Sequence, residues 1–371
     1  MAPLKDRPFA AILNSRQSKT PLGTDAWIAR TLEAVEYAVR ELNATIISSC
    51  ELMTWDLVTW KTGQLSGSVE LLVRGGFGDE RSKKRLCNSY ELHPRLLELR
   101  ELDDLHPVNR RKFWWEDRDR AIVEAADVII PVSMRRGGNL ERLLLEDGST
   151  GHVDRRFMVP YKPTPHHNRY EFGPEELNPA LHRWKGGSLI HWTRTCHGPW
   201  PGESVAGFCR DLVASREFYC RDACRTLIQI LREQRIRGSR QHISQLRDMV
   251  GFTELNPIQS LTQMHWRKRW VNWSFEPFGI AIPRDVAQSL GARPVRYVDE
   301  STWRTLPWDE RPFCHQQGTE SHWVSEREWR LQGDLDLSNV PQDELIIIVY
   351  NGRDVDHVRR VWDGPVISMT R

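Results

Sequence analysis

The sequence lacks a long hydrophobic segment, a marked excess of charge of either sign, and any internal repeat or low-complexity tract. No apolar run approaches the ~20 residues that a helix needs to cross a bilayer, and residues 1–8 lack the apolar core of a signal peptide. We therefore expect a cytoplasmic protein with no membrane partner. The formal net charge of +2 comes from 52 basic and 50 acidic residues, so the chain as a whole does not attract a polyanion, although basic clusters can still form locally.

The sequence also lacks cysteine pairs at the regular spacings of a disulfide framework or a complete zinc site. The seven cysteines are scattered and odd in number, which predicts free thiols in a reducing compartment. Cys220 and Cys224 lie one helical turn apart and suit half of a zinc site, but no second Cys/His pair has the compact spacing that the other half needs, Cys196-His197 being a poor candidate. We therefore predict no metal.

The length of 371 residues favours two domains. Strand and helix patterns alternate through the first 146 residues. The expected strands are 9–13, 45–48, 69–73 and 127–132, and the expected helices are 28–42, 119–126 and 140–146. Such alternation predicts an α/β domain of Rossmann-like architecture, with a parallel sheet covered by helices on both faces. We place this domain at residues 1–161, with 158–161 as a candidate last strand.

The pattern changes after residue 161. Several prolines and the pair His166-His167 indicate a linker over residues 162–187. A helix over 219–234 and several short strands then predict a mixed α+β domain with a largely antiparallel sheet over residues 188–371. The expected strands are 188–192, 250–253, 279–282, 294–298, 329–331 and 345–350.

Polar loops follow three of the expected N-terminal strands. Their candidate ligand-binding residues are Ser15, Arg16, Ser18, Lys19, Ser49, Gly137 and Gly138. Loops that follow parallel strands lie at the carboxyl edge, where open α/β sheets bind ligands, and amides at a helix N-terminus attract phosphate. Two consecutive glycines let the backbone approach a ligand closely. We expect a nucleotide-binding site here, while the alternative that these loops merely connect the sheet stays open.

Three segments resemble the SLOG superfamily, the group that contains DprA and the LOG nucleotide hydrolases. They are ILNSRQSK (12–19), IISSCELMTWD (46–56) and ADVIIPVSMRRGGNLE (126–141), and the resemblance covers about residues 8–161. LOG hydrolases carry PGGxGTxxE, whereas here Leu144 stands where the glutamate would fall. The resemblance therefore implies nucleotide binding or sensing, without hydrolysis at this site.

Candidate catalytic side chains gather in two segments of the C-terminal half. His191 and Arg194 occur in LIHWTR (189–194), and Glu326 and Glu328 occur in EREWR (326–330). Carboxylates at i and i+2 of an extended segment point the same way. One can stabilise an oxocarbenium-like transition state and the other can accept a proton. His191 suits contact with a ribose or its leaving base, and Arg194 suits a pyrophosphate.

A structural explanation of the same residues stays open. The two glutamates can form ion pairs with Arg327 and Arg330 on an exposed strand, and His191 can be a core histidine beside Trp192.

The C-terminal half is similar to the ADP-ribosyltransferase superfamily in its first-strand histidine, its helix followed by Gly238-Ser239, and its late Glu-x-Glu. A closer likeness, over about residues 185–350, is to bacterial abortive-infection (AbiGi-like) domains through FTE (252–254), FGIAI (278–282), PVRY (294–297) and EREWR. The resemblance implies that NAD or another nucleotide is bound, with Ser239 as a contact. Ser239, Thr253 and Tyr297 compete for the transferases' middle-strand Tyr or Ser.

The segment HWRKRW (265–270) is the one local cluster of basic and aromatic residues. Arg267, Lys268 and Arg269 among tryptophans suit phosphate contact and base stacking. On a helix, however, Trp266 and Trp270 would form an i,i+4 pair facing the core, and we favour this helical interpretation.

These observations predict a bacterial defence-type effector or modification enzyme, acting as a transferase or glycohydrolase on NAD or another N-glycosidic substrate, with anti-phage defence as the setting implied by the abortive-infection resemblance. One alternative is a nucleic-acid-binding enzyme that modifies a base in DNA or RNA, supported by residues 265–270 and a basic helix over 221–247. A second is a non-catalytic nucleotide sensor.

Overall fold

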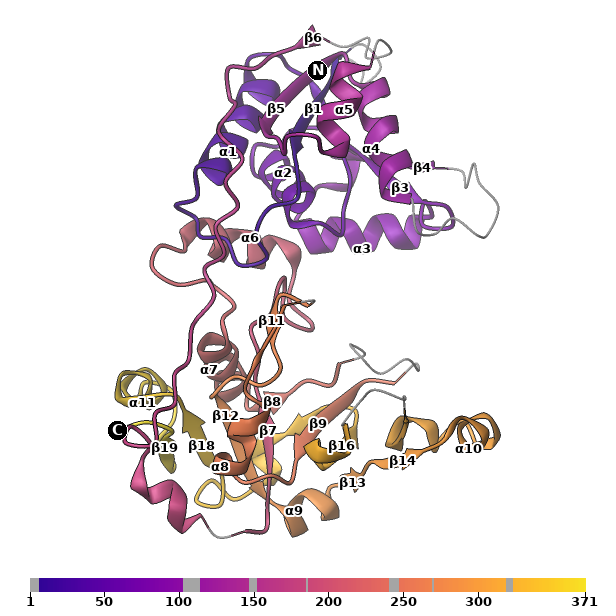
Figure 1. Cartoon of the computed structure of the whole chain (residues 1–371). Coiled ribbons are helices and arrows are strands. Elements are labelled where there is room, and N and C mark those ends of the chain that lie inside the picture. The colour runs from indigo at the N-terminus through magenta and orange to yellow at the C-terminus, as the bar shows by residue number, and fades with distance from the viewer. Residues whose placement is uncertain are drawn as a thin grey trace. The chain divides into compact units, whose positions relative to one another are not determined.

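The computed structural model describes residues 7–102, 114–146, 152–184, 186–239, 247–268, 270–317 and 323–371 (Figure 1). Contacts divide the chain into a first unit, Met1–His167 with His197–Cys220, and a second unit, Asn168–Cys196 with Arg221–Arg371. Residues 197–220, which the sequence pattern placed in the C-terminal domain, thus belong to the first unit. Among the described residues, no helix combines the length and apolar character needed to cross a membrane.

A six-stranded parallel sheet forms the centre of the first unit, in the order β4-β3-β2-β1-β5-β6 (Figure 1). Its strands are β1 (Phe9–Asn14), β2 (Thr45–Ser48), β3 (Val69–Arg74), β4 (Leu97–Leu102), β5 (Val128–Ser133) and β6 (His152–Val153). Its helices are α1 (Ala26–Arg40), α2 (Met53–Gln64), α3 (Glu80–Tyr90), α4 (Trp114–Ala125), α5 (Asn139–Leu145) and α6 (Val205–Ala214). The predicted Rossmann-like α/β architecture is confirmed.

Alternate residues of β1 belong to separate hydrophobic cores on the two faces of this sheet. Ala10 and Ile12 pack in a core that includes residues of α1 and α6, whereas Ala11 and Leu13 pack in a core that includes residues of α4 and α5. A strand buried on both faces needs apolar residues at every position, which explains the continuous run FAAIL. The predicted last strand over 158–161 is wrong, because only an isolated bridge between Ser133 and Val159 forms there.

A seven-stranded sheet forms the centre of the second unit, in the order β13-β16-β9-β7-β12-β18-β19. Its strands are β7 (Ser188–Trp192), β9 (Met249–Thr253), β12 (Gly279–Pro283), β13 (Arg293–Pro294), β16 (Glu328–Gln332), β18 (Ile346–Val349) and β19 (Val366–Ser368). Every neighbouring pair is antiparallel except β18 with β19. The predicted mixed sheet with mostly antiparallel strands is therefore confirmed.

Short helices and three two-stranded sheets surround this sheet. The helices are α7 (Ala223–Glu233), α8 (Pro257–Ser260), α9 (Arg284–Ser289), α10 (Glu300–Thr305) and α11 (Gly352–Arg359). The two-stranded sheets pair β8 (Arg235–Ile236) with β17 (Leu335–Asp336), β10 (Trp266–Arg267) with β11 (Asn272–Trp273), and β14 (Arg296–Val298) with β15 (Cys314–Gln316). The expected single strand over 294–298 is thus divided between two sheets.

The helical interpretation of residues 265–270 is wrong. Trp266 lies in β10, and its ring packs edge-on against Trp273 of β11, with centroids 6.0 Å apart. Trp270, expected to face the core, is 54% exposed. The basic helix expected over 221–247 is also shorter, because α7 ends at Glu233 and Gln234 adopts a left-handed φ of 48°.

Candidate functional site

Two of the four predicted catalytic residues lie on strands of the second unit, His191 in β7 and Glu328 in β16, with β9 between these strands. Residue Ile190 of β7 pairs with Thr253 of β9, and Thr253 pairs with Glu328 at the start of β16. Paired residues share a face of a sheet, and consecutive residues alternate between faces. Glu328 therefore shares its face with Thr253, while His191 shares the opposite face with Phe252.

His191 nonetheless reaches the strand that separates it from Glu328. Its Nδ1 lies 2.8 Å from the carbonyl oxygen of Gly251, and its ring centroid is 6.0 Å from that of Phe252. Burial lowers the pKa of His191 to about 4, so the ring is neutral at pH 7. Because a carbonyl oxygen only accepts, Nδ1 carries the proton and Nε2 is an acceptor.

Gly251 lies near both side chains. A Cβ placed on it would lie 3.8 Å from Oε1 of Glu328, and its carbonyl accepts the His191 hydrogen bond. The path from Nδ1 of His191 through the carbonyl, Cα and Cβ position of Gly251 to Oε1 of Glu328 is about 11 Å long. The two side-chain atoms therefore lie no farther apart than this. The absence of a side chain at Gly251 leaves room beside the carboxylate.

Glu328 is held by a buried arginine. Its Oε1 accepts from Nε of Arg330 at 2.7 Å and its Oε2 from Nη2 at 2.9 Å. Arg330 is only 5% exposed, and its Nη1 donates to the carbonyl oxygens of Pro312 at 2.8 Å and Cys314 at 3.3 Å. The ion pair between Glu328 and Arg330 that the structural alternative expects therefore forms, but its arginine is buried and not on an exposed strand.

Glu326 does not continue the strand of Glu328. It ends a 3₁₀ turn over Trp323–Glu326, and Arg327 adopts a left-handed φ of 45°. The expectation of two carboxylates aligned on one extended segment is thus wrong. The two still interact, because burial first and the charge of Glu328 second raise the pKa of Glu326, while Arg267 and Arg194 lower it. Arg267 Nη2 lies 3.4 Å from Glu326 Oε1.

Arg194 is exposed and lies within electrostatic range of the same carboxylates. Loss of solvent lowers the pKa of its guanidinium, and the charges of Glu326, Glu276 and Glu328 act in the opposite direction. A buried carboxyl fixes the loop that carries it: Glu276 accepts from the backbone N–H of Thr195 at 2.6 Å and from the Tyr170 hydroxyl at 2.9 Å. Arg194, Arg267, Glu326 and Glu328 therefore form one cluster of opposite charges, which we call the carboxylate–arginine cluster.

Tyr297 lies next to Glu328 of the cluster. Burial and the charge of Glu328 raise the pKa of Tyr297 to about 12, and its hydroxyl also hydrogen-bonds the backbone of Glu328. It thus adjoins the cluster, as does Thr253, whose hydroxyl donates to the Glu326 carbonyl at 2.5 Å. Ser239, the third candidate for the middle-strand role, pairs with Met249 at the far end of β9, about 13 Å along the strand from Thr253.

The three basic residues proposed for nucleic-acid contact separate in the structure. Arg267 pairs with Glu326, Lys268 is exposed, and Arg269 lies outside the described residues. Trp270 and Val271 beside them are 54% and 42% exposed.

The predicted loops of the first unit come together only in part. The Ser15 hydroxyl accepts from the backbone N–H of Arg135 at 2.9 Å, which joins the first loop to the glycine loop. In that loop Gly137, at φ 68°, donates to the Glu141 carboxylate at 2.5 Å, and the Gly138 N–H donates to the Arg135 carbonyl. Ser49 is buried and donates to Leu72 of the neighbouring strand.

Arg16 and Lys19 lie close together in the first loop, since desolvation and the charge of Arg16 lower the pKa of Lys19. Ser18 accepts from the backbone N–H of Thr20 at 3.2 Å. His197, from the segment before α6, lies nearby, because burial and then the charge of Lys19 lower the pKa of His197 to about 4. None of these positions except His197 lines the cavity of this unit.

That cavity, of about 460 Å³, follows the ends of β2 and β3. Its wall combines apolar side chains with a buried acid and two arginines, namely Asp56, Arg74 and Arg85, and also includes His197 and Phe77. Burial raises the pKa of Asp56 to about 7, and the Tyr90 hydroxyl donates to its carboxyl at 2.5 Å. Sequence patterns missed this site because its acid lies on a helix that was not predicted.

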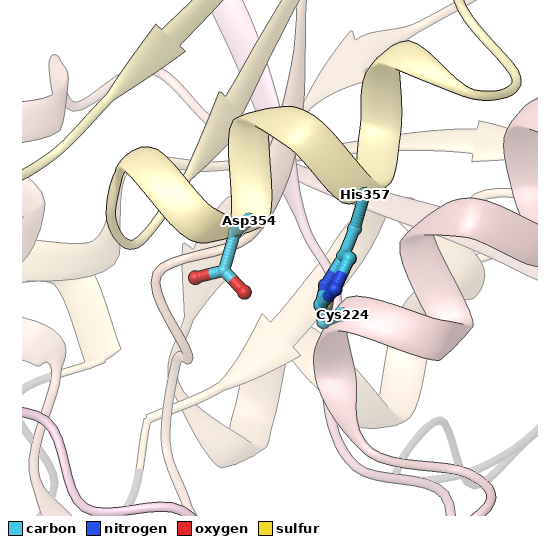
Figure 2. Close-up of side chains that lie close together, drawn as sticks. All are labelled: Cys224, Asp354 and His357. Carbon is cyan, nitrogen blue, oxygen red and sulfur yellow. The ribbon is translucent and has the colours of Figure 1, made fainter.

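Cys224, Asp354 and His357 form a separate group in the second unit. Each offers one metal-ligating atom, and these atoms lie within 4.8 Å of one another. Figure 2 shows Asp354 and His357 projecting from α11 toward the end of α7 that carries Cys224. Cys220, the partner considered in the sequence, packs in a core of the first unit instead.

Comparison with known proteins identifies no relative of this chain among family models or curated proteins. The resemblances to the SLOG and ADP-ribosyltransferase superfamilies therefore stay predictions.

Proposed function

We propose that the second unit is an ADP-ribosyltransferase-like catalytic domain that cleaves the N-glycosidic bond of NAD or a related nucleotide. The observation that carries this proposal is the carboxylate–arginine cluster beside Gly251. It combines an acid pair suited to a cationic sugar with two guanidinium groups suited to a pyrophosphate. The resemblance of the first-strand histidine and the late Glu-x-Glu to transferases supports the same chemistry.

Glu328 is the residue that would face the sugar. Arg330 engages each carboxylate oxygen once, which leaves one lone pair on each to accept from a ribose hydroxyl. As the bond from C1′ to the nicotinamide nitrogen breaks, its electron pair leaves with nicotinamide. The carboxylate of Glu328 stabilises the oxocarbenium-like sugar that remains.

Glu326 is the residue that would move a proton. Its raised pKa makes it a stronger base than an ordinary glutamate. A hydroxyl or amine nucleophile attacks C1′, and its proton passes to Glu326, so the transfer is balanced. Arg194 would hold the pyrophosphate, and His191 would act as a positioning residue that holds Gly251.

Incubation of the purified full-length chain with NAD, alone and with protein, single-stranded DNA or double-stranded DNA, tests the proposal. Mass spectrometry of every component should show free nicotinamide and ADP-ribose on water or on an acceptor. Glu328→Gln should abolish this and Glu326→Gln should lower it strongly, whereas Glu344→Gln, at an exposed position, should behave as the parent. An intact NAD pool with every acceptor, or an active Glu328→Gln variant, would refute NAD cleavage by this cluster and favour a non-catalytic sensor.

The acceptor in this proposal can be a nucleic acid. The loop between β10 and β11 exposes Lys268, Trp270 and Val271, and the adjoining Arg267 contacts Glu326. A strand stacked on Trp270 would therefore lie beside the carboxylates. Lys268→Glu should weaken single-stranded DNA retention at low salt, whereas Lys162→Glu in the first unit should not; equal retention by both variants argues against DNA at this loop.

For the first unit we propose nucleotide binding at the carboxyl edge of its sheet. The cavity would take the base and ribose, and Arg16 and Lys19 near His197 would take phosphate. Equilibrium dialysis with NAD and ADP-ribose tests this. Arg85→Ala, in the cavity wall, should weaken binding, whereas Arg81→Ala, on the same helix and outside the wall, should not. The SLOG resemblance supports this assignment, and the abortive-infection resemblance supports anti-phage defence as the setting.

A further inference from the structure

We propose that Cys224, Asp354 and His357 bind one divalent ion of the zinc class. Asp354 and His357 are spaced i,i+3 on α11, so both project from one face of that helix (Figure 2). Cys224 supplies a sulfur from α7, and the three ligand atoms already lie within 4.8 Å of one another. The proposal is independent of the carboxylate–arginine cluster and of the reaction assigned to it.

The residue types favour zinc over calcium or magnesium. Thiolate, imidazole and carboxylate are the side chains that bind Zn²⁺ in proteins, whereas Ca²⁺ and Mg²⁺ prefer oxygen alone. With ordinary bond lengths, tetrahedral zinc holds its ligand atoms roughly 3.3–3.8 Å apart. The group would have to close by no more than about 1.5 Å at its widest separation. A fourth position would remain for water, since Asp354 and His357 are only half-buried.

Local structure fixes the ligands on both helices. Asn351 caps α11 by accepting from the backbone N–H groups of Arg353 at 2.9 Å and Asp354 at 3.2 Å, and its own N–H donates to the Asp354 carboxylate at 3.3 Å. Cys224 is the second residue of α7, whose cap Asp222 accepts from the Arg225 N–H at 2.9 Å. A thiolate at a helix N-terminus is favoured by the helix dipole.

The charges around the group also favour a cation. Asp222 caps α7 two residues before Cys224, so a second carboxylate lies close to the thiol in addition to that of Asp354. The site thus gathers one thiol, one imidazole and two carboxylates, with the Asp222 charge partly offset by Arg225 at 2.6 Å. A divalent ion would take the place of the thiol proton and balance this negative charge. It would also tie α7 to α11, which lies between β18 and β19 in the chain.

Metal titration of the untagged full-length chain tests the proposal. After chelation and dialysis, Zn²⁺ binding is measured by calorimetry, and Co²⁺ binding is followed by the thiolate-to-metal charge-transfer band. We expect one tight equivalent with that band. Cys224→Ser should remove the band, and His357→Gln and Asp354→Asn should each weaken binding by at least roughly a hundredfold.

Matched controls separate this site from the other thiols and acids. Asp356→Asn changes an exposed acid on the same helix, and Cys50→Ser removes a half-buried thiol elsewhere; both should bind as the parent does. Thermal unfolding in chelator should show that the site variants still fold, with only the parent and controls gaining stability on adding Zn²⁺. Binding that survives Cys224→Ser and His357→Gln, or no tight equivalent in the parent, would overturn the proposal.

Discussion

Arg330 and Glu328 form a two-point ion pair in which the buried guanidinium of Arg330 holds both carboxylate oxygens of Glu328, at 2.7 and 2.9 Å. The same guanidinium binds the carbonyls of Pro312 and Cys314. Arg330 therefore connects the proposed catalytic carboxylate of Glu328 to the segment of Pro312 and Cys314. Arg330 and Glu328 are two residues apart and lie on one face of β16. The carboxylate's position is thus set before any ligand arrives.

Replacing this arginine should destabilise the second unit. Arg330→Met leaves Glu328 without its partner, and breaking a buried pair costs about 3–5 kcal/mol. Because the Glu328 side chain is 25% exposed, we expect a loss of about 3 kcal/mol in the free energy of unfolding, measured by urea denaturation. Arg304→Met removes an exposed pair with Glu300 and should cost at most about 1 kcal/mol.

The double variant Glu328→Gln/Arg330→Met checks the cause of that loss. Removing both charges should recover part of the stability, since no unpaired carboxylate remains. Losses that simply add would contradict an interaction between the two side chains.

Two buried carboxyl groups predict how stability depends on pH. Burial raises the pKa of Asp56 in the first unit and of Glu276 in the second unit to about 7 each. The folded chain then keeps protons that the unfolded chain releases near pH 4. Between about pH 4 and pH 7 the unfolded state binds fewer protons, so stability falls as pH rises, by up to about 3 to 4 kcal/mol per group.

Asp56→Asn and Glu276→Gln should each flatten this decline. The free energy of unfolding, measured by urea denaturation at several pH values from 4 to 7.5, should lose less across the window in each variant than in the parent. A control at an exposed acid, Asp343→Asn, should keep the parent's slope. An unchanged slope in Asp56→Asn would mean that this carboxyl is already ionised at pH 5 in the folded chain.

The sequence predicted the strands of both sheets better than it predicted their helices. Runs such as FAAIL and VELLV are buried strands because parallel strands inside an α/β sheet have no polar face. The helix α2 was missed because it is buried on nearly every side, from Thr54 to Thr62, so no apolar stripe of helical period marks it. Segment 197–220 was assigned to the wrong half because spatial contacts, not chain order, place α6 in a core of the first unit.

The candidate site was predictable in residue type but not in geometry. His191, Arg194, Glu326 and Glu328 were named from their chemistry, yet the left-handed Arg327 that breaks their alignment has no sequence signal. The group of Cys224, Asp354 and His357 escaped prediction because Cys224 lies more than a hundred residues before the other two members. Pairing across α7 and α11 is a property of the fold, whereas spacing rules detect only ligands that are close in sequence.

Glycines 279 and 352 should respond in opposite ways to the same substitution. A Cβ on Gly279 would lie 2.8 Å from the Trp192 ring and 3.0 Å from the His191 carbonyl oxygen. The backbone of β7 cannot move away easily, because it is hydrogen-bonded to β12. Gly279→Ala should therefore cost about 1–3 kcal/mol. Gly352 begins α11 with open space around its Cβ, so Gly352→Ala should be neutral or stabilising by up to about 1 kcal/mol. Thermal unfolding separates the two, and a stable Gly279→Ala variant would show that β12 and β7 can move apart.

The glycine loop of the first unit offers a test of where a nucleotide's phosphate binds. The Gly137 N–H, which a phosphate would need, donates to the Glu141 carboxylate at 2.5 Å. If phosphate binds at this loop, the carboxylate competes for the same amide and repels the anion. Glu141→Ala should then tighten ADP-ribose binding several-fold in equilibrium dialysis, about 1 kcal/mol for an anion at a helix N-terminus. Glu124→Ala, which removes an exposed acid on α4, should leave the affinity unchanged. Unchanged affinity in Glu141→Ala would place the phosphate away from the glycine loop, as expected if Arg16 and Lys19 hold it.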